Sequence, residues 1–455
     1  MKKVLITLAA VVILACSLFI VASAADYGYL ADDLNSLGLF KGTDTGYDLD
    51  SGATRAQAVT MLVRLLGKDA TALAGGFQDP FTDVPEWAAP YVAYAYQNGL
   101  TNGVSDTAFG PSGPCSAQMY VTFVLRALGY DDKLGDFSYA NAIDFGKTLG
   151  IVDDALTSGD FLRDQMVAVS YRALFTQPNG GANDTLLQKL IAGGAIDVNA
   201  AADVLNKFAL FDEFSAVGSE LQDAKKIAMT MNMDMQASAF GQSVAMTMNM
   251  DMNMIMGEND DILASIKMDI NTAGEAQTMQ MYIANGYAYV DDGTKKEKMD
   301  LALSGSEDML NMANVSQFAA FPSYAISDIS KSNDGDFTVY TIKIADAFMT
   351  GVMSQALGMV GDMGFGDVGI SDMSLSIPEM QFYVDSSGAL TKIIMPMEVK
   401  LTVDTGGVAV TVPVSANMEM NITAVGDAVT VTLPNDLGDY VLVDTENAVA
   451  DGMAA

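Results

Sequence analysis

Two arginines stand where they could recognise a carboxylate. Arg55 lies between Thr54 and Gln57, and Arg163 is likewise followed two positions later by Gln165. A Thr with a Gln three residues later predicts a capped helix start. A helix N-terminus carries partial positive charge and unpaired amides, and a guanidinium beside it adds bidentate binding of a carboxylate. The alternative is that Thr54 and Gln57 form only a capping box and that Arg55 points into water.

The helices that would carry these arginines belong to a repeat. Three segments align without gaps, TRAQAVTMLVRLLG (54–67), SAQMYVTFVLRALG (116–129) and LRDQMVAVSYRALF (162–175). One arginine falls in register in all three segments, at Arg64, Arg126 and Arg172. Upstream, the end of a preceding helix is marked by GLFKG (38–42), GLTNG (99–103) and GIVDD (150–154). The pattern therefore predicts three helical hairpins in tandem.

The middle repeat is the most detailed. Asp83 and Pro85 are typical of a helix start. They are followed, at spacings of three and four residues, by Trp87, Tyr91, Tyr94 and Asn98, which predicts one helix face. Gly99 is typical of a helix end. Ser116 is predicted to cap the next helix, whose buried stripe would comprise Val121, Val124, Leu125 and Leu128.

At these residues the chain resembles the S-layer homology domain, over residues 26–178. The strongest match is FTDVPEWAAPYV followed by GLTNG and FGP in the middle repeat. The resemblance implies an all-α trimer of three repeats with pseudo-threefold symmetry, at residues 26–70, 78–130 and 131–178. In that family the grooves between helical prongs bind a pyruvylated secondary polysaccharide of the bacterial cell wall. Carried onto this chain, the family's Thr-Arg-Ala-Glu motif, aromatic and glycine imply the binding residues Arg55, Gln57, Trp87, Gly103, Arg163 and Gln165.

The match is uneven from repeat to repeat. Gln replaces the family's Glu at both Gln57 and Gln165, Leu162 replaces the capping Thr, and Ala117 stands in place of the middle arginine. At most two of the three grooves therefore keep their arginine. Trp87 could serve either as a packing residue or as a platform for a sugar.

The first residues resemble an export signal. Lys2 and Lys3 precede an apolar run, and Ala22-Ser23-Ala24 fits a small-residue cleavage site. We predict a secretory signal peptide at residues 1–25 that is removed. The alternative is a lipoprotein lipidated at Cys16. After removal of the leader only Cys115 remains, so no intramolecular disulfide is predicted. Cys115 precedes a predicted helix start, where a thiol can become acidic, although a small loop residue is the simpler interpretation.

Composition excludes several functions. The chain has no histidine, and 57 acidic residues oppose 23 basic ones for a net charge of −34. The absence of histidine excludes His-based nucleophilic catalysis and His-bearing zinc sites. Such a negative surface repels nucleic acid and anionic membranes. We predict a protein of the bacterial cell surface that is not an enzyme and has neither a cofactor nor a metal.

A different pattern begins after the repeats. Residues 179–226 are predicted to be a helical connector. From residue 227 the period becomes two, and the octet AMTMNMDM occurs at both 228 and 245, which predicts two adjacent antiparallel strands joined near Phe240-Gly241. Methionines occupy one face of both strands and are candidates to line an apolar cavity: Met229, Met231, Met233, Met246, Met248 and Met250. Core packing and copper(I) binding are the alternatives.

Further alternation predicts more strands in a domain at residues 227–445, followed by a tail at 446–455. The strands are expected at 262–270, 278–290, 337–344, 380–384, 389–403, 408–414, 418–425 and 428–433, with turns at 291–293, 333–335, 386–388 and 405–407. Helices are expected at 307–320 and 345–360. The result would be a curved antiparallel sheet or half-barrel over two helices. The run MQMYIANGYAYVDDGTKKEKMDL (279–301) resembles bacterial half-barrel lipoproteins that carry lipids.

The sequence thus predicts a multidomain protein, all-α and then mainly antiparallel β. The repeats would anchor it to a secondary cell-wall polysaccharide, and the β domain would bind a hydrophobic small molecule or lipid. An S-layer or scaffold component with an empty β domain is the alternative.

Overall fold

The computed structural model describes residues 27–42, 46–157, 159–181, 184–217, 221, 224–239, 242–257, 262–272, 274–300, 325–345, 370–404 and 409–443. The predicted signal peptide, Cys16, the turn at 405–407, the tail and the helix predicted at 307–320 lie outside these residues, as does the helix predicted at 345–360 except for its first residue. The chain divides into a helical unit, Asp26–Asn206, and a sheet unit, which contains Lys207–Ala455. Each unit is described by itself.

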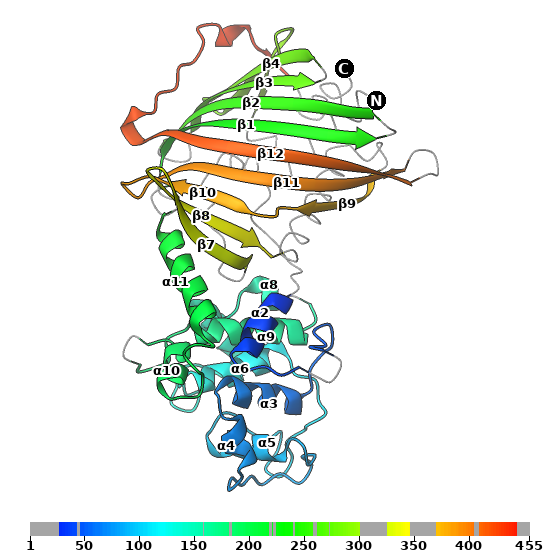
Figure 1. The fold of residues 1–455 in the computed structure, drawn as a ribbon, viewed down its shortest axis with the longest axis vertical. Helices are drawn as coiled ribbons and strands as arrows, with labels where there is room; N and C mark the ends of the chain where they lie inside the picture. The colour runs from blue at the N-terminus through cyan, green and yellow to red at the C-terminus, as the bar shows by residue number, and fades with distance from the viewer. Residues whose placement is uncertain are drawn as a thin grey trace. The chain divides into compact units, whose positions relative to one another are not determined.

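The helical unit consists of short helices joined by turns and loops (Figure 1). Its elements are α2 (Gly28–Ser36), α3 (Arg55–Leu65), α4 (Asp69–Leu73), α5 (Ala89–Gln97), α6 (Ala117–Ala127), η1 (Tyr139–Asn141), α7 (Ala142–Thr148), α8 (Asp154–Thr157), α9 (Arg163–Leu174) and α10 (Leu186–Ala192). The three aligned segments of the repeat form α3, α6 and α9. The side chains of Thr54 and Ser116 accept backbone hydrogen bonds at the starts of α3 and α6.

The repeats close into a ring. Helices α3, α6 and α9 contact one another, and each also packs against the first helix of the next repeat: α3 with α5, α6 with α7, and α9 with α2. We call these three pairs prongs. The helix pairs with the most extensive packing thus join consecutive repeats, whereas the sequence predicts a hairpin within each repeat. Since α9 packs on α2, the third repeat closes onto the first.

In the middle repeat, the helix predicted to start at Asp83 and Pro85 starts later. Helix α5 begins at Ala89, with Pro90 in its first turn, so Trp87 precedes the helix. Asp83 instead accepts hydrogen bonds from the amides of Phe109 (2.7 Å) and Gly110 (2.9 Å). These bonds favour the charged carboxylate and lower the pKa of Asp83. Asp83 therefore holds the loop before α6.

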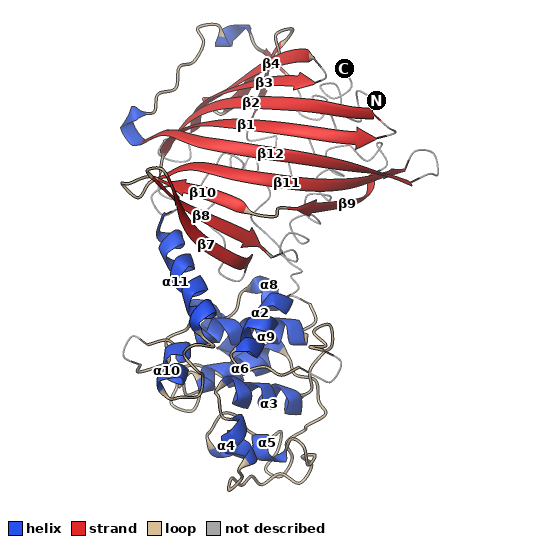
Figure 2. Cartoon of the chain, viewed as in Figure 1, coloured by secondary structure: helices blue, strands red, loops and turns tan. Residues whose placement is uncertain are grey.

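Among the described residues of the sheet unit, thirteen strands form one mainly antiparallel, open and curved sheet (Figure 2). Its order is β13-β6-β5-β4-β3-β2-β1-β12-β11-β10-β8-β7, and β9 also pairs with β11. The strands are β1 (Lys226–Ala239), β2 (Gln242–Met256), β3 (Ile262–Thr272), β4 (Glu275–Ala284), β5 (Tyr287–Asp291), β6 (Lys296–Asp300), β7 (Ile326–Asp334), β8 (Phe337–Ile344), β9 (Ile370–Ser376), β10 (Met380–Val384), β11 (Leu390–Asp404), β12 (Ala409–Val425) and β13 (Val441–Leu442).

The duplicated octet forms the adjacent antiparallel strands β1 and β2, as predicted. Met231 faces Met250 across this pair and Met420 on the other side. The candidate methionines Met229, Met233, Met246 and Met248 are buried, whereas Met231 and Met250 are half-buried. Alternate residues between them are polar and mostly exposed, so the sheet has one apolar and one wet face.

Four predicted strands differ from the structure. The strand expected at 278–290 is split into β4 and β5 by Asn285 and Gly286, whose φ angles of 55° and 78° form the tight turn that Asn-Gly favours. The strands expected at 408–414 and 418–425 are the single strand β12, and residues 428–433 form no strand.

Helix α11 (Ala202–Val217) begins in the connector region and continues into the sheet unit. Its Phe214 is fully buried, with its ring 5.6 Å from that of Tyr340 and 4.8 Å from that of Phe382. Within the described parts of the chain, no helix has the length and apolarity needed to cross a membrane.

Candidate binding groove

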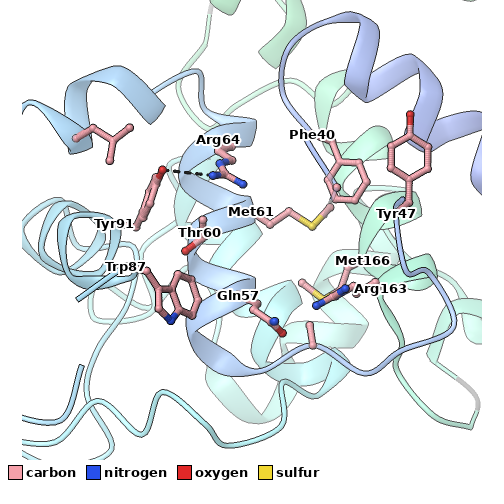
Figure 3. Close-up of a pocket in the computed structure, with 13 residues that line it drawn as sticks. Phe40, Tyr47, Gln57, Thr60, Met61, Arg64, Trp87, Tyr91, Arg163 and Met166 are labelled. Carbon is pink, nitrogen blue, oxygen red and sulfur yellow. Dashed lines mark hydrogen bonds between the residues drawn. The ribbon is translucent and has the colours of Figure 1, made fainter. Parts of the chain in front are cut away.

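A pocket of about 560 Å³ lies in the helical unit. We call it the open groove. It is lined by side chains from several elements (Figure 3), namely Phe40, Gly42, Tyr47, Ala53, Gln57, Thr60, Met61, Arg64, Leu73, Trp87, Tyr91, Arg163 and Met166. One wall comes from α3, α4, α5 and the turn before α5, and the other from α9 together with Phe40, Gly42, Tyr47 and Ala53. The open groove therefore lies between the α3–α5 prong and the α9–α2 prong.

Three of the predicted binding residues meet in the open groove, Gln57, Trp87 and Arg163. In Figure 3, Gln57 is drawn between the other two. Trp87 is the only tryptophan of the chain and is 52% exposed. The side-chain oxygen of Gln57 accepts a hydrogen bond from the Thr54 amide (2.9 Å), which leaves the NH₂ end of Gln57 as the donor that the groove can use.

Arg163 is held by an acidic neighbour. Its Nη1 lies 2.5 Å from Oδ2 of Asp48, and its side chain is 14% exposed against 45% for that of Asp48. The other oxygen of Asp48 accepts a hydrogen bond from the Ser51 hydroxyl (2.7 Å). Arg163 thus reaches the groove as one member of an ion pair.

Arg64 is the second cation of the lining, and it braces the prong. Its Nε donates to Asp69 (3.0 Å), and Asp69 also accepts from Tyr91 (2.8 Å) and Lys41 (2.9 Å). Burial alone would raise the pKa of Asp69, but these three hydrogen bonds lower it to about 2. Since Arg126 pairs with Asp132, and Arg172 with Asp153, the in-register arginines share a structural role.

Arg55 does not line the open groove, although the repeat places it at the same position as Arg163. It is only 8% exposed. Its guanidinium donates to the Asn102 carbonyl and to the sulfur of Met119 (3.0 Å), and it lies 4.8 Å and 5.3 Å from the ring centroids of Phe109 and Phe123. Burial lowers the pKa of Arg55. No ion pair involves it among the described residues, and its Nε has no hydrogen-bond partner there.

The prediction of unpaired amides at the helix starts is wrong. The amides of Arg55 and Ala56 donate to the carbonyls of Gly113 (2.8 Å) and Pro111 (3.1 Å). The third repeat docks on the first in the same way, since Arg163 donates to Ser51 (3.0 Å) and Asp164 to Leu49 (3.1 Å). Because the first amides are already paired, an anion can meet only the side chains at these helix starts.

Two further predicted residues act elsewhere. A Cβ at Gly103 would collide with the ring of Phe81 and with the carbonyls of Ser105 and Ala108, so the backbone requires glycine there. The side-chain oxygen of Gln165 accepts a hydrogen bond from the amide of Leu162 (2.8 Å) at the start of α9. Both residues lie outside the open groove's lining.

Sequence reasoning missed most of the groove's apolar lining. Phe40, Tyr47 and Met61 carry no motif of their own. Two features of the sequence could have indicated them. Phe40 lies within the repeated GLFKG segment, and Met61 lies four residues after Gln57, which places both on the same face of α3. The acidic-thiol alternative for Cys115 is also wrong, since the residue is buried and burial raises its pKa to about 12.

Parts of the sequence are similar to known surface proteins. The S-layer homology domain matches residues 80–116. A "Cell surface protein" of Thermoanaerobacter kivui is 28% identical over 206 residues, which cover 44% of this chain and 24% of that protein. A "Middle cell wall protein" of Brevibacillus brevis is 29% identical over 148 residues, covering 30% and 14% respectively. This chain therefore spans less than a quarter of the length of either relative, and neither name describes an enzyme.

Solved structures with some similarity include LprF from Mycobacterium bovis, at 9% identity and a TM-score of 0.28, covering 50% of this chain and 95% of that one. A putative outer membrane lipoprotein-sorting protein domain from Vibrio parahaemolyticus has 10% identity and a TM-score of 0.17, covering 49% and 94%. The match at residues 80–116 and the surface-protein relatives show that the chain carries an S-layer homology segment and is a cell-surface protein associated with the wall.

Proposed function

We propose that the open groove binds an anionic polysaccharide of the cell wall and thereby anchors the chain. The observation that carries the proposal is the charge of the lining. Among the described residues the groove's lining has two arginines and no carboxylate, although the whole chain has a net charge of −34. Each arginine is paired with a carboxylate that is not part of the lining, Arg163 with Asp48 and Arg64 with Asp69. A groove of about 560 Å³ is also within the range of about 300–1,000 Å³ typical of ligand sites.

The side chains suit a sugar that bears a carboxylate, such as a pyruvyl ketal. Arg163 would hold the carboxylate, and a hydrogen bond between charged groups contributes about 1.5–3 kcal/mol. The exposed face of Trp87 would stack on the apolar face of a sugar ring. Gln57 would donate to a sugar hydroxyl from its NH₂ group. Arg64 would add positive potential while it stays bound to Asp69.

The proposal is tested by co-sedimentation with wall sacculi. Purified chain is mixed with native sacculi and with sacculi stripped of their secondary polymer. We expect wild-type chain to pellet only with the native sacculi, and Arg163→Gln to weaken binding at least tenfold because the carboxylate loses its cation. Lys147→Gln is the matched control, since it also removes one positive charge but lies on α7, outside the groove's lining. Equal pelleting with both kinds of sacculi would contradict the proposal.

For the sheet unit, binding of an apolar ligand by the methionine face stays a prediction. Burial of Met229, Met233, Met246 and Met248 is compatible with core packing as well as with a ligand-lining role. Native mass spectrometry of the purified chain checks it. A co-purified lipid-sized mass is expected if the face binds ligand, and the bare chain mass is expected if the unit is a structural module.

A further inference from the structure

Two turns in the helical unit are structurally equivalent but chemically different. The carbonyls of residues 48–51 accept two backbone hydrogen bonds from the first amides of α9. The carbonyls of residues 110–113 accept the equivalent pair from the first amides of α3. The first position of each turn lies in the left-handed region, with φ of 54° at Asp48 and 73° at Gly110. The middle repeat thus has glycine where the first repeat has a carboxylate.

Backbone geometry alone favours glycine at this position. A residue with a Cβ is strained at positive φ, although Asp and Asn tolerate it better than most. Such strain persists where the surrounding structure gains from the side chain. At Asp48 the contacts show that gain, because one carboxylate oxygen meets Arg163 at 2.5 Å and the other accepts from Ser51 at 2.7 Å.

Asp48 pairs with Arg163, the cation that would bind a ligand carboxylate in the open groove. Arg163 lines the groove, and its side chain is only 14% exposed, so few directions of approach to the guanidinium remain. The Asp48 carboxylate makes the kind of contact that a ligand carboxylate would make. Asp48 is itself half-exposed, so it can move away without leaving a buried charge.

We propose that Asp48 is an internal competitor that sets the specificity of the groove. This inference rests on the proposed function of the groove. A tethered carboxylate acts at an effective concentration in the millimolar range or above. Small free carboxylates therefore fail to displace it. A glycan that gains additional contacts at Trp87 and Gln57 succeeds, so the groove responds to a carboxylate only when a sugar carries it.

The test is titration of the full-length chain with polymer released from native sacculi, by isothermal calorimetry. Asp48→Asn keeps the size of the side chain and tolerates the left-handed backbone, but removes the competing charge. We expect it to bind polymer about fivefold more tightly, the size of effect given by a partly exposed ion pair. Sodium acetate at 50 mM, an added probe, is expected to inhibit Asp48→Asn more than wild type.

Asp50→Asn is the matched control. Asp50 is exposed in the same turn, and the variant changes the net charge equally without touching the partner of Arg163. We expect it to bind within twofold of wild type. Asp48→Gly reproduces the middle repeat's residue and should behave like Asp48→Asn, which guards against a misfolded variant.

The outcomes separate the two claims. Polymer binding by wild type, with tighter binding by Asp48→Asn and Asp48→Gly but not by Asp50→Asn, supports both. Binding by wild type that Asp48→Asn leaves equal or weaker overturns the role of Asp48 and leaves the groove's function standing. The same gain in Asp50→Asn also overturns it, because general charge would then be the cause. Absence of polymer binding by wild type overturns the proposed function and this inference together.

Discussion

Arg55 and Arg163 occupy the same position of the repeat and make the same backbone connection, yet of the two only Arg163 lines the open groove. The difference comes from the opposite wall. Arg163 faces Gln57 and Met61 of α3. Arg55 faces the aligned residues of α6, Met119 and Phe123, and these fill the space above its guanidinium. The motif therefore identifies the position of the arginine, but the side chains of the facing repeat determine whether a groove is open beside it.

The largest expected effect is the loss of stability on substitution of the buried Arg55. Arg55→Ala should lower the free energy of unfolding by about 3 kcal/mol, because it opens a cavity beside Phe109 and Phe123 and removes the charged hydrogen bond to the Asn102 carbonyl. Arg55→Met should leave stability within about 1 kcal/mol of wild type, since a well-packed apolar side chain can replace a buried charge. Urea denaturation measures both.

Arg163 supplies the contrast to this result. Its substitution should change polymer binding with little effect on unfolding, whereas Arg55→Met should leave polymer binding unchanged. Loss of binding in Arg55→Met, with normal stability, would mean that the filled position opens in solution and that the two arginines are not different.

A smaller effect, on polymer binding, is expected at Trp87. Trp87→Ala should weaken polymer binding about tenfold, or about 1.4 kcal/mol, because the groove loses its stacking surface. Stability should stay within about 0.5 kcal/mol, since the side chain is 52% exposed. Tyr96→Ala is a suitable control: it also removes an exposed aromatic ring of the second repeat, outside the groove's lining. Both variants are titrated with released polymer by calorimetry. If Trp87→Ala weakened polymer binding no more than Tyr96→Ala does, the groove would not be the site.

The smallest effect concerns the second cation of the groove. The pKa of Asp69 is lowered from 3.8 to about 2, so its stabilisation of the prong is present above pH 4 and is lost as the pH falls through 2. We expect about 1 kcal/mol from this partly exposed cluster. Asp69→Asn should therefore lower the free energy of unfolding at pH 6 and flatten its decline between pH 4 and 2. An unchanged acid profile would show that Arg64 is not held by Asp69.

Much of the fold follows from local pattern. The aligned helices, the caps at Thr54 and Ser116 and the duplicated strands β1 and β2 each depend on residues close in sequence. The start of α5 could not be predicted, because Asp83 bonds a loop 26 residues away in place of capping the helix. The split at Asn285-Gly286 was predictable from a turn signal that the alternation obscured.

The groove was less predictable than the fold. Gln57, Trp87 and Arg163 were found because each stands in or beside a motif. The burial of Arg55 depends on Met119 and Phe109, which lie 64 and 54 positions away in sequence. The pairing of Arg163 with Asp48, 115 positions apart, likewise required the ring closure of the third repeat on the first.

The most direct test of the account uses the fluorescence of Trp87, the only tryptophan in the chain. Released wall polymer is titrated into the full-length chain while emission and acrylamide quenching are followed. A ligand in the open groove should shift the emission to the blue and protect the indole from acrylamide, saturably, in wild type and Arg55→Met but not in Arg163→Gln. Emission and quenching that stay unchanged at polymer concentrations where the chain pellets with sacculi would contradict the groove as the binding site.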